Sequence, residues 1–163
     1  MFQNYLVNFT FYIKWSIEYN WFPTHLKVKS MKHKNVLIVE NPSKLKASNY
    51  FIEFDDRDGK SRYVTTVEIW YKSKRYNKWI VLEKYFDSDG ATGAYDINSF
   101  GWLMHDKLCN TGKFNDASTC SNWQASKVLR DILDEESRWV RKHTWFWATW
   151  LFGGGKARKN GMY

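Results

Sequence analysis

The sequence predicts an α+β fold, in which a small antiparallel β-meander is followed by a three-helix C-terminal half. Residues 36–86 combine short apolar runs with alternating apolar and polar residues, a pattern typical of strands. Both prolines, Pro23 and Pro42, precede residue 87, so neither interrupts the helical periodicity that follows. Strands that are grouped before helices, instead of alternating with them, indicate the α+β class.

We expect a single domain at residues 31–163, preceded by an aromatic N-terminal extension at residues 1–30. A chain of 163 residues is long enough to bury one hydrophobic core. Within the domain we expect strands at about 36–86, a loop at 87–98, helices at about 99–152 and a basic tail at 153–163. Polar and charged residues interrupt the hydrophobic start of the chain, so we expect neither a signal peptide nor a transmembrane segment.

Turn-forming segments separate the predicted strands. "NVLIVE" and "NYFIEF" are short apolar runs that begin the meander. "DDRDGKS" supplies a hairpin turn, because Asp58-Gly59 suits a backbone with positive φ. "RYVTTVEIWY" then alternates along its length, which predicts a strand. After "KSKRYN" turns the chain, "KWIVLEKYF" closes the sheet.

Capping residues mark the ends of the predicted helices. The first helix begins near Asn98 or Ser99, either of which can cap it, and ends near Gly112. The second begins with a capping box, S-x-x-Q, at residues 121–124. The third ends at Gly153.

The third helix carries a stripe of large apolar residues at helical spacing. Such a stripe is more often core than surface, so we expect its rings to be largely buried, in the core or against a partner chain, and its cations to be solvated. The stripe includes Trp139, Phe146, Trp147 and Trp150, and the cations are Arg138, Arg141 and Lys142. The other interpretation is a helix that lies in a membrane interface, where Trp rings suit the depth of the headgroups.

The composition points to a partner surface. Aromatic residues make up 19% of the chain, and Trp and Tyr are the side chains that anchor interfaces. The net charge of +8 favours a polyanionic partner, which can be nucleic acid, anionic lipid or an acidic protein. In the basic tail, Lys156, Arg158 and Lys159 can neutralise phosphates, but no aromatic residue is interleaved before Tyr163. We therefore expect these four residues to be solvated or to contact a protein partner.

A glycine-rich loop leads into a helix on which His105 stands beside Asp106, in "DGATGAYDINSFGWLMHDKLC". Such a loop can direct carbonyl oxygens at calcium, and a carboxylate on the following helix can add an anionic ligand. Asp106 would then bind the ion while His105 faces a water as general base. Asp87 and Asp89 are further candidate calcium ligands, or ordinary turn residues. We expect instead a buried polar pair without a cofactor, in which His105 is hydrogen-bonded to the loop or to the second helix and fixes the loop to the helices.

Two resemblances bear on this segment. Its His-Asp helix after a glycine-rich loop resembles phospholipase A2. More broadly, "DGATG…D…S…HDKL", "NWQAS.VL.DIL" and "WFWATWLFGGGKAR" are similar, in this order, to the domain of unknown function 1353 family of tailed phages. This resemblance covers residues 87–158 and implies a phage protein. Cys109 departs from the Tyr of that pattern, and Ser126 departs from an Asp. Because Ser126 cannot stabilise an imidazolium, the departure puts catalysis in doubt.

We therefore expect a phage protein whose role is structural or interaction-based, in the tail or genome-delivery apparatus of the virion. It would be made in the host cytoplasm and would bind other virion proteins, with nucleic acid or anionic lipid as further partners for its basic surface. The alternative from another class is a calcium-dependent lipid or envelope hydrolase that uses His105 and Asp106.

The two cysteines flank the loop that reverses the chain between the first and second helices. That reversal brings the helix ends together, so Cys109 and Cys120 are candidates for a disulfide that forms outside the reducing cytoplasm. The alternative is a pair of small apolar side chains with no bond between them.

Overall fold

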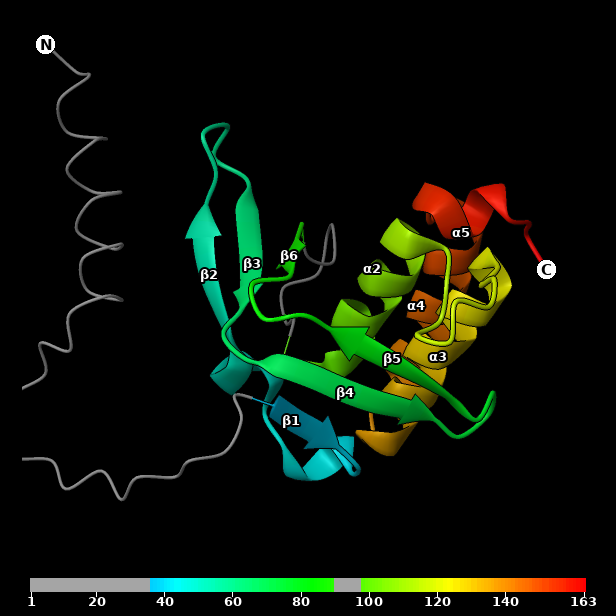
Figure 1. Ribbon diagram of the computed structural model, residues 1–163, viewed down its shortest axis with the longest axis horizontal. Coiled ribbons are helices and arrows are strands. Elements are labelled where there is room, and N and C mark those ends of the chain that lie inside the picture. The colour runs from blue at the N-terminus through cyan, green and yellow to red at the C-terminus, as the bar shows by residue number, and fades with distance from the viewer. Residues whose placement is uncertain (1–35, 90–97) are drawn as a thin grey trace, which may run out of the picture. The chain divides into compact units, whose positions relative to one another are not determined.

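The computed structural model describes residues 36–89 and 98–163, and it confirms the α+β class (Figure 1). The strands are β1 (Val36–Val39), β2 (Phe51–Asp55), β3 (Ser61–Thr65), β4 (Glu68–Ser73), β5 (Lys78–Leu82) and β6 (Asp87–Ser88). The helices are α2 (Phe100–Thr111), α3 (Asn122–Glu135), α4 (Trp139–Phe152) and the short α5 (Gly155–Lys159). Two 3-10 turns, η1 (Pro42–Lys44) and η2 (Ala47–Tyr50), follow β1. The expected N-terminal extension at 1–30 lies outside the described residues.

The strands form two sheets instead of one meander. One 3-stranded sheet has the order β1-β4-β5 and the other has the order β2-β3-β6. All strand pairs are antiparallel except β1 with β4, which is parallel, with Val36 opposite Glu68. The exception follows from the connection, because the 3-10 turns and the β2–β3 hairpin lie between β1 and β4 in the chain. A crossover of that length allows parallel pairing, which a tight hairpin does not.

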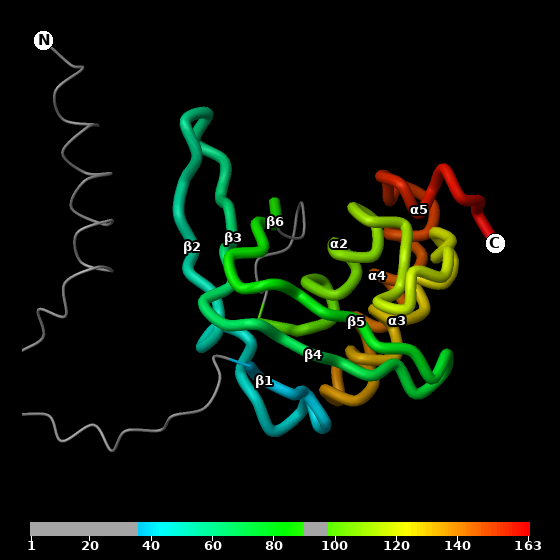
Figure 2. Tube along the Cα trace, in the orientation of Figure 1, coloured from blue at the N-terminus to red at the C-terminus, as the bar shows by residue number. Residues whose placement is uncertain are grey.

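The segment "RYVTTVEIWY" is not a single strand, because it breaks at residues 66–67 (Figure 2). At the break, the Thr66 amide donates to Tyr50 O at 2.9 Å, and the Thr65 hydroxyl donates to Glu83 O at 2.8 Å. These bonds pair the Thr66 amide and the Thr65 hydroxyl with carbonyl groups outside the strand ladders. The chain can therefore change direction here, and β3 and β4 belong to different sheets. The predicted alternation survives the break, since Tyr63 and Thr65 in β3, like Ile69 in β4, are buried.

The predicted turn and helix caps are confirmed. Gly59 has φ +72° in the β2–β3 hairpin. Ser99 caps α2 by accepting from the Gly101 amide at 2.9 Å, and Gly112 ends that helix with φ +64°. Ser121 and Gln124 form the predicted capping box of α3. Local signals therefore fix the bounds of these helices.

Helix α2 is the centre of the core. It packs against β5, α3 and α5, and Figure 1 shows it between the strands and the α3–α4 pair. A Cβ added at Gly101 would lie 2.8 Å from a side-chain carbon of Leu129, so this glycine allows α2 and α3 to approach closely. The α2 side chains in the core are Phe100, Trp102, Leu103, Met104, Leu108 and Cys109.

The segment expected to be a basic tail at 153–163 is docked on the end of α2. Its helix α5 buries Ala157 completely, and the Asn160 side-chain amide donates to Gly112 O at 2.7 Å and to Cys120 O at 3.0 Å. The backbone amide of Asn122 donates to Gly161 O at 3.0 Å. The bonds from Asn160 thus join α5 to carbonyl groups at the end of α2 and of the following loop, where Gly112 O also accepts from the Cys120 backbone amide at 2.8 Å.

We expect the Gly155→Ala variant to lose stability, because Gly155 has φ +80° and a Cβ there would lie 2.4 Å from the Cys109 carbonyl oxygen. The combined strain and overlap should lower the free energy of unfolding by about 1–3 kcal/mol in urea titrations. Gly154→Ala is the matched control, since no atom lies within 4 Å of a Cβ at that position. Equal stability of the two variants would show that α5 is not docked closely on α2.

Candidate functional site

The predicted His-Asp pair lies where β6 meets α2. The Ser88 hydroxyl donates a hydrogen bond to Asp106 Oδ2, and Asp106 Oδ1 lies 3.5 Å from His105 Nδ1. The other imidazole nitrogen, Nε2, lies 3.4 Å from the sulfur of Cys109. Both carboxylate oxygens and both imidazole nitrogens therefore face groups of the protein itself.

His105 is buried, as predicted, with 6% of its surface exposed. Its partners Asp106 and Cys109 belong to its own helix, not to the second helix that we expected. The other expected partner, the "DGATG" loop, falls largely in residues 90–97, outside the described residues. Through Ser88, the pair fixes the end of β6 to α2.

The electrostatics of His105 oppose a role as general base. Burial alone lowers the pKa of His105, but hydrogen bonds to Asp106 and Cys109 outweigh it and raise that pKa well above its ordinary value. At neutral pH the imidazole therefore holds its proton. A general base must be unprotonated and must reach the proton that it abstracts. In the arrangement that the described residues form, both imidazole nitrogens are engaged within helix α2.

The other candidate calcium ligands are placed differently. Asp87 is held by Arg62, with Nε 3.1 Å from Oδ1 and Nη2 2.8 Å from Oδ2. Asp89 is exposed. Among the residues at 36–89 and 98–163, no group of three or more His, Cys, Asp or Glu side chains is placed to hold a metal ion. The calcium site belongs to the alternative interpretation, and it stays untested because the loop that would complete it lies outside the described residues.

Ser126, which stands where the resembling phage family has an Asp, joins two helices. Ser126 of α3 is fully buried and accepts a hydrogen bond from the Thr149 hydroxyl of α4 at 3.0 Å. The same hydroxyl lies 2.9 Å from Trp145 O within α4. Ser126 therefore contributes to the packing of α3 on α4.

Both cysteines are free and buried. Cys109 contacts His105, as described above. Burial raises the pKa of the Cys120 thiol to about 12. The candidate disulfide outside the reducing cytoplasm stays a prediction.

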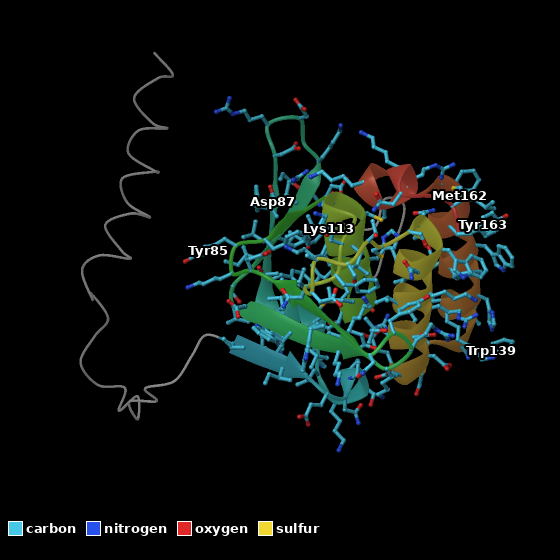
Figure 3. The ribbon with its side chains drawn as sticks, turned by 45° about the vertical axis from the view of Figure 1, so that its right-hand side comes forward. Tyr85, Asp87, Lys113, Trp139, Met162 and Tyr163 are labelled. Carbon is cyan, nitrogen blue, oxygen red and sulfur yellow. The ribbon has the colours of Figure 1, made fainter. Side chains whose placement is uncertain are left out.

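The expectation that the aromatic stripe of α4 is core is wrong for two of its residues. Phe146 is buried and Trp150 is half-buried, but Trp139 and Trp147 are exposed. We name as the α4 face the exposed large apolar residues of this helix: Trp139 (69% exposed), Val140 (64%), Trp147 (50%), Leu151 (45%) and Phe152 (83%). Figure 3 shows Trp139 on the outer side of the helices. An exposed apolar surface of this kind marks an interaction site.

Two cations that we expected in solvent lie partly covered instead. Arg138 Nε lies 3.2 Å from Glu136 Oε2, and the Lys142 ammonium pairs with Asp134 of α3. The inner side of α4 thus combines ion pairs with the Phe146 ring, while apolar side chains occupy the outer side. The reason is that the main neighbour of α4 is α3, whose facing side carries charged groups.

The sequence contains one signal for the exposed apolar side of α4. Residues 137–163 contain no Asp or Glu, and apolar residues occupy nearly all sides of the predicted helix. A helix that is apolar all round is expected in a large core or at a membrane. A chain of this size has no second layer to cover such a helix on every side, so part of its apolar surface must be exposed.

The residues predicted as a partner surface are exposed. Lys156, Arg158 and Lys159 lie on α5, and Tyr163 is 83% exposed at the C-terminus. Arg158 Nη1 lies 2.9 Å from both Leu151 O and Gly153 O, so its charge sits at the C-terminal end of the α4 face. The Tyr163 ring lies 5.8 Å from the Trp150 ring.

Comparisons of the chain with protein-family models, curated proteins and solved structures find no match. Within the part of the chain that the structure describes, every helix is too short or too polar to span a bilayer.

We expect His105 to remain protonated through neutral pH, because its pKa is raised by its hydrogen bonds to Asp106 and Cys109. The stability that this proton provides is complete below about pH 6.5, the ordinary imidazole pKa, and is lost as the pH rises through the raised value. NMR titration of the imidazole nitrogens, assigned with His105→Gln, measures this directly. A neutral ring at pH 7 would restore the general-base interpretation.

We expect the two sides of α4 to differ in their contribution to stability. Phe146 is 3% exposed and its ring lies 5.0 Å from the Trp123 ring, so Phe146→Ala should cost about 3–5 kcal/mol. Trp147 is half exposed, and its ring lies 5.2 Å from the Phe146 ring and 5.3 Å from the Trp150 ring, so Trp147→Ala should cost less, about 1–2 kcal/mol. Chemical denaturation of both variants measures the difference. A large loss in Trp147→Ala would mean that its ring is part of the core.

Proposed function

We propose that the chain is a phage protein that works by binding rather than by catalysis, as a structural or interaction component of the virion. The resemblance of residues 87–158 to a tailed-phage family supports the phage origin and a place in the tail or genome-delivery apparatus. Under this proposal the protein is made in the host cytoplasm and ends in the particle.

The observation that carries the binding role is the α4 face. Large apolar side chains, including two Trp, are exposed along one helix of the C-terminal half. Leaving such side chains in water forgoes roughly 1.5–3 kcal/mol for each one that a partner would bury. A partner that covers them gains this free energy, which is the usual basis of a specific contact.

The burial of the His-Asp pair also supports a binding role rather than catalysis. His105 and Asp106 have the residue types of a catalytic site, but they are bonded to each other and to Cys109 and Ser88. This arrangement ties β6 to α2 and leaves the pair a structural role. The calcium-dependent hydrolase remains the alternative, and it would require Asp106 to leave the Ser88 hydroxyl to bind calcium; a calcium titration of the whole chain would test it.

We expect the protein to be present in purified phage particles at a constant copy number, measured by quantitative mass spectrometry. Phe152→Glu places a charge on the α4 face at its most exposed residue, which is 83% exposed, so it should lower the copy number while leaving the fold unchanged. Ile52→Glu is a matched control, because Ile52 is 59% exposed on β2, outside the α4 face. Absence of the wild-type protein from particles would overturn the proposal.

A further inference from the structure

The α4 face is one continuous apolar stripe with exposed rings at the ends of the helix. Val140, Trp147 and Leu151 lie about two and three turns apart, which places them on the same side of α4. Trp139 and Phe152, the most exposed of the set, are the first and last residues of the helix. Figure 3 shows Trp139 toward one end of the helical layer and Tyr163 toward the other.

The polar groups of the stripe are mostly at the edges of aromatic rings: the indole N–H groups of Trp139 and Trp147, which suit the headgroup region, and the imidazole of His143, whose ring lies 5.8 Å from that of Trp139. Thr144, which is exposed within the stripe, directs its hydroxyl to Val140 O and Arg141 O, each at 3.3 Å. Ala148, the next exposed residue along it, has no polar side chain. A protein interface of standard size has about one hydrogen bond per 100–200 Å². The hydrocarbon region of a bilayer requires none, so the chemistry of the stripe suits lipid better than protein.

The charges around the stripe are of one sign. Residues 137–163, which form α4, α5 and their flanks, contain cations and no Asp or Glu. Arg158 is held at the C-terminal end of the stripe by Leu151 O and Gly153 O. Lys156 and Lys159 are exposed on the same short helix. This distribution complements a negatively charged surface.

From these observations we infer that the α4 face binds the interface of an anionic lipid bilayer, with α4 lying in the plane of the membrane. Trp side chains favour the headgroup depth, and apolar residues such as Val140 and Leu151 enter the acyl boundary. The cations of α5 contact lipid phosphates at the end of the helix. A helix of 14 residues is too short to span the bilayer, so it lies along the interface.

This inference rests on the proposed function and names the partner of its binding surface. The lipid would be that of the host membrane, which a tail or genome-delivery component meets at infection. The particle experiment and the lipid experiment are independent. Absence of the protein from particles would refute the virion role but not lipid binding. Failure to bind vesicles would refute the lipid partner but not the virion role.

The test is co-sedimentation of the full chain with vesicles of phosphatidylcholine, with and without phosphatidylglycerol. We expect binding to the vesicles that contain phosphatidylglycerol, and weaker binding to phosphatidylcholine alone or at high salt. Trp147→Ala and Leu151→Ala should each weaken binding about tenfold. Ile52→Ala, at an exposed apolar residue of β2, should leave it unchanged. Lys156→Gln with Lys159→Gln should weaken binding to the anionic vesicles alone.

Three results would overturn the inference. Vesicle binding that is equal in wild type, Trp147→Ala and Leu151→Ala would assign the affinity to net charge and not to the α4 face. Self-association that Trp147→Ala abolishes, without vesicle binding, would make a second copy of the chain the occupant. Binding to duplex DNA in place of vesicles would make nucleic acid the partner. Circular dichroism of each variant establishes that it is folded, and Val140→Ala replaces any that is not.

Discussion

Helix α2 is covered by β5, by α3 and, at its C-terminal end, by α5, and the other elements take their places from this burial. Two glycines allow the close approaches: Gly101 admits Leu129 of α3, and Gly155 admits the Cys109 carbonyl group. The C-terminal segment then closes the end of the helix through hydrogen bonds from Asn160. Most side chains of α2 are buried, so substitutions at these contacts act on the whole domain.

The same burial determines what the His-Asp pair can do. On an exposed helix, His105 and Asp106 would be solvated and available to a substrate. Inside the core, a charged side chain without a partner is strongly destabilising, so each group must be satisfied by a neighbour. Asp106 is satisfied by His105 and Ser88, and the imidazolium by Asp106 and Cys109. The residue types that suggest catalysis from the sequence are here a means of burying polar groups beside the strand end.

Local signals made part of this fold predictable from the sequence. The caps at Ser99 and Gly112, and the turn at Gly59, depend on neighbouring residues alone, and the structure confirms them. The break at residues 66–67 was not predictable, because alternation fixes which side chains point inward but not which strand lies alongside. The orientation of α4 was missed for a related reason. A helix that is apolar on nearly all sides has no polar face to indicate which side meets solvent.

The inner and outer sides of helix α4 have different roles. Its inner side is committed to the fold, because Phe146 packs on Trp123, Thr149 bonds to Ser126, and the ammonium group of Lys127 lies 4.6 Å from the centre of the Phe146 ring. Its outer side makes no comparable contribution, since α3 is its main neighbour and can cover one side of a helix only. Exposed apolar side chains reduce solubility without adding stability to the isolated chain. Burial of these side chains would gain hydrophobic free energy that the described part of the chain leaves unrealised, which is the basis of the binding role that we propose.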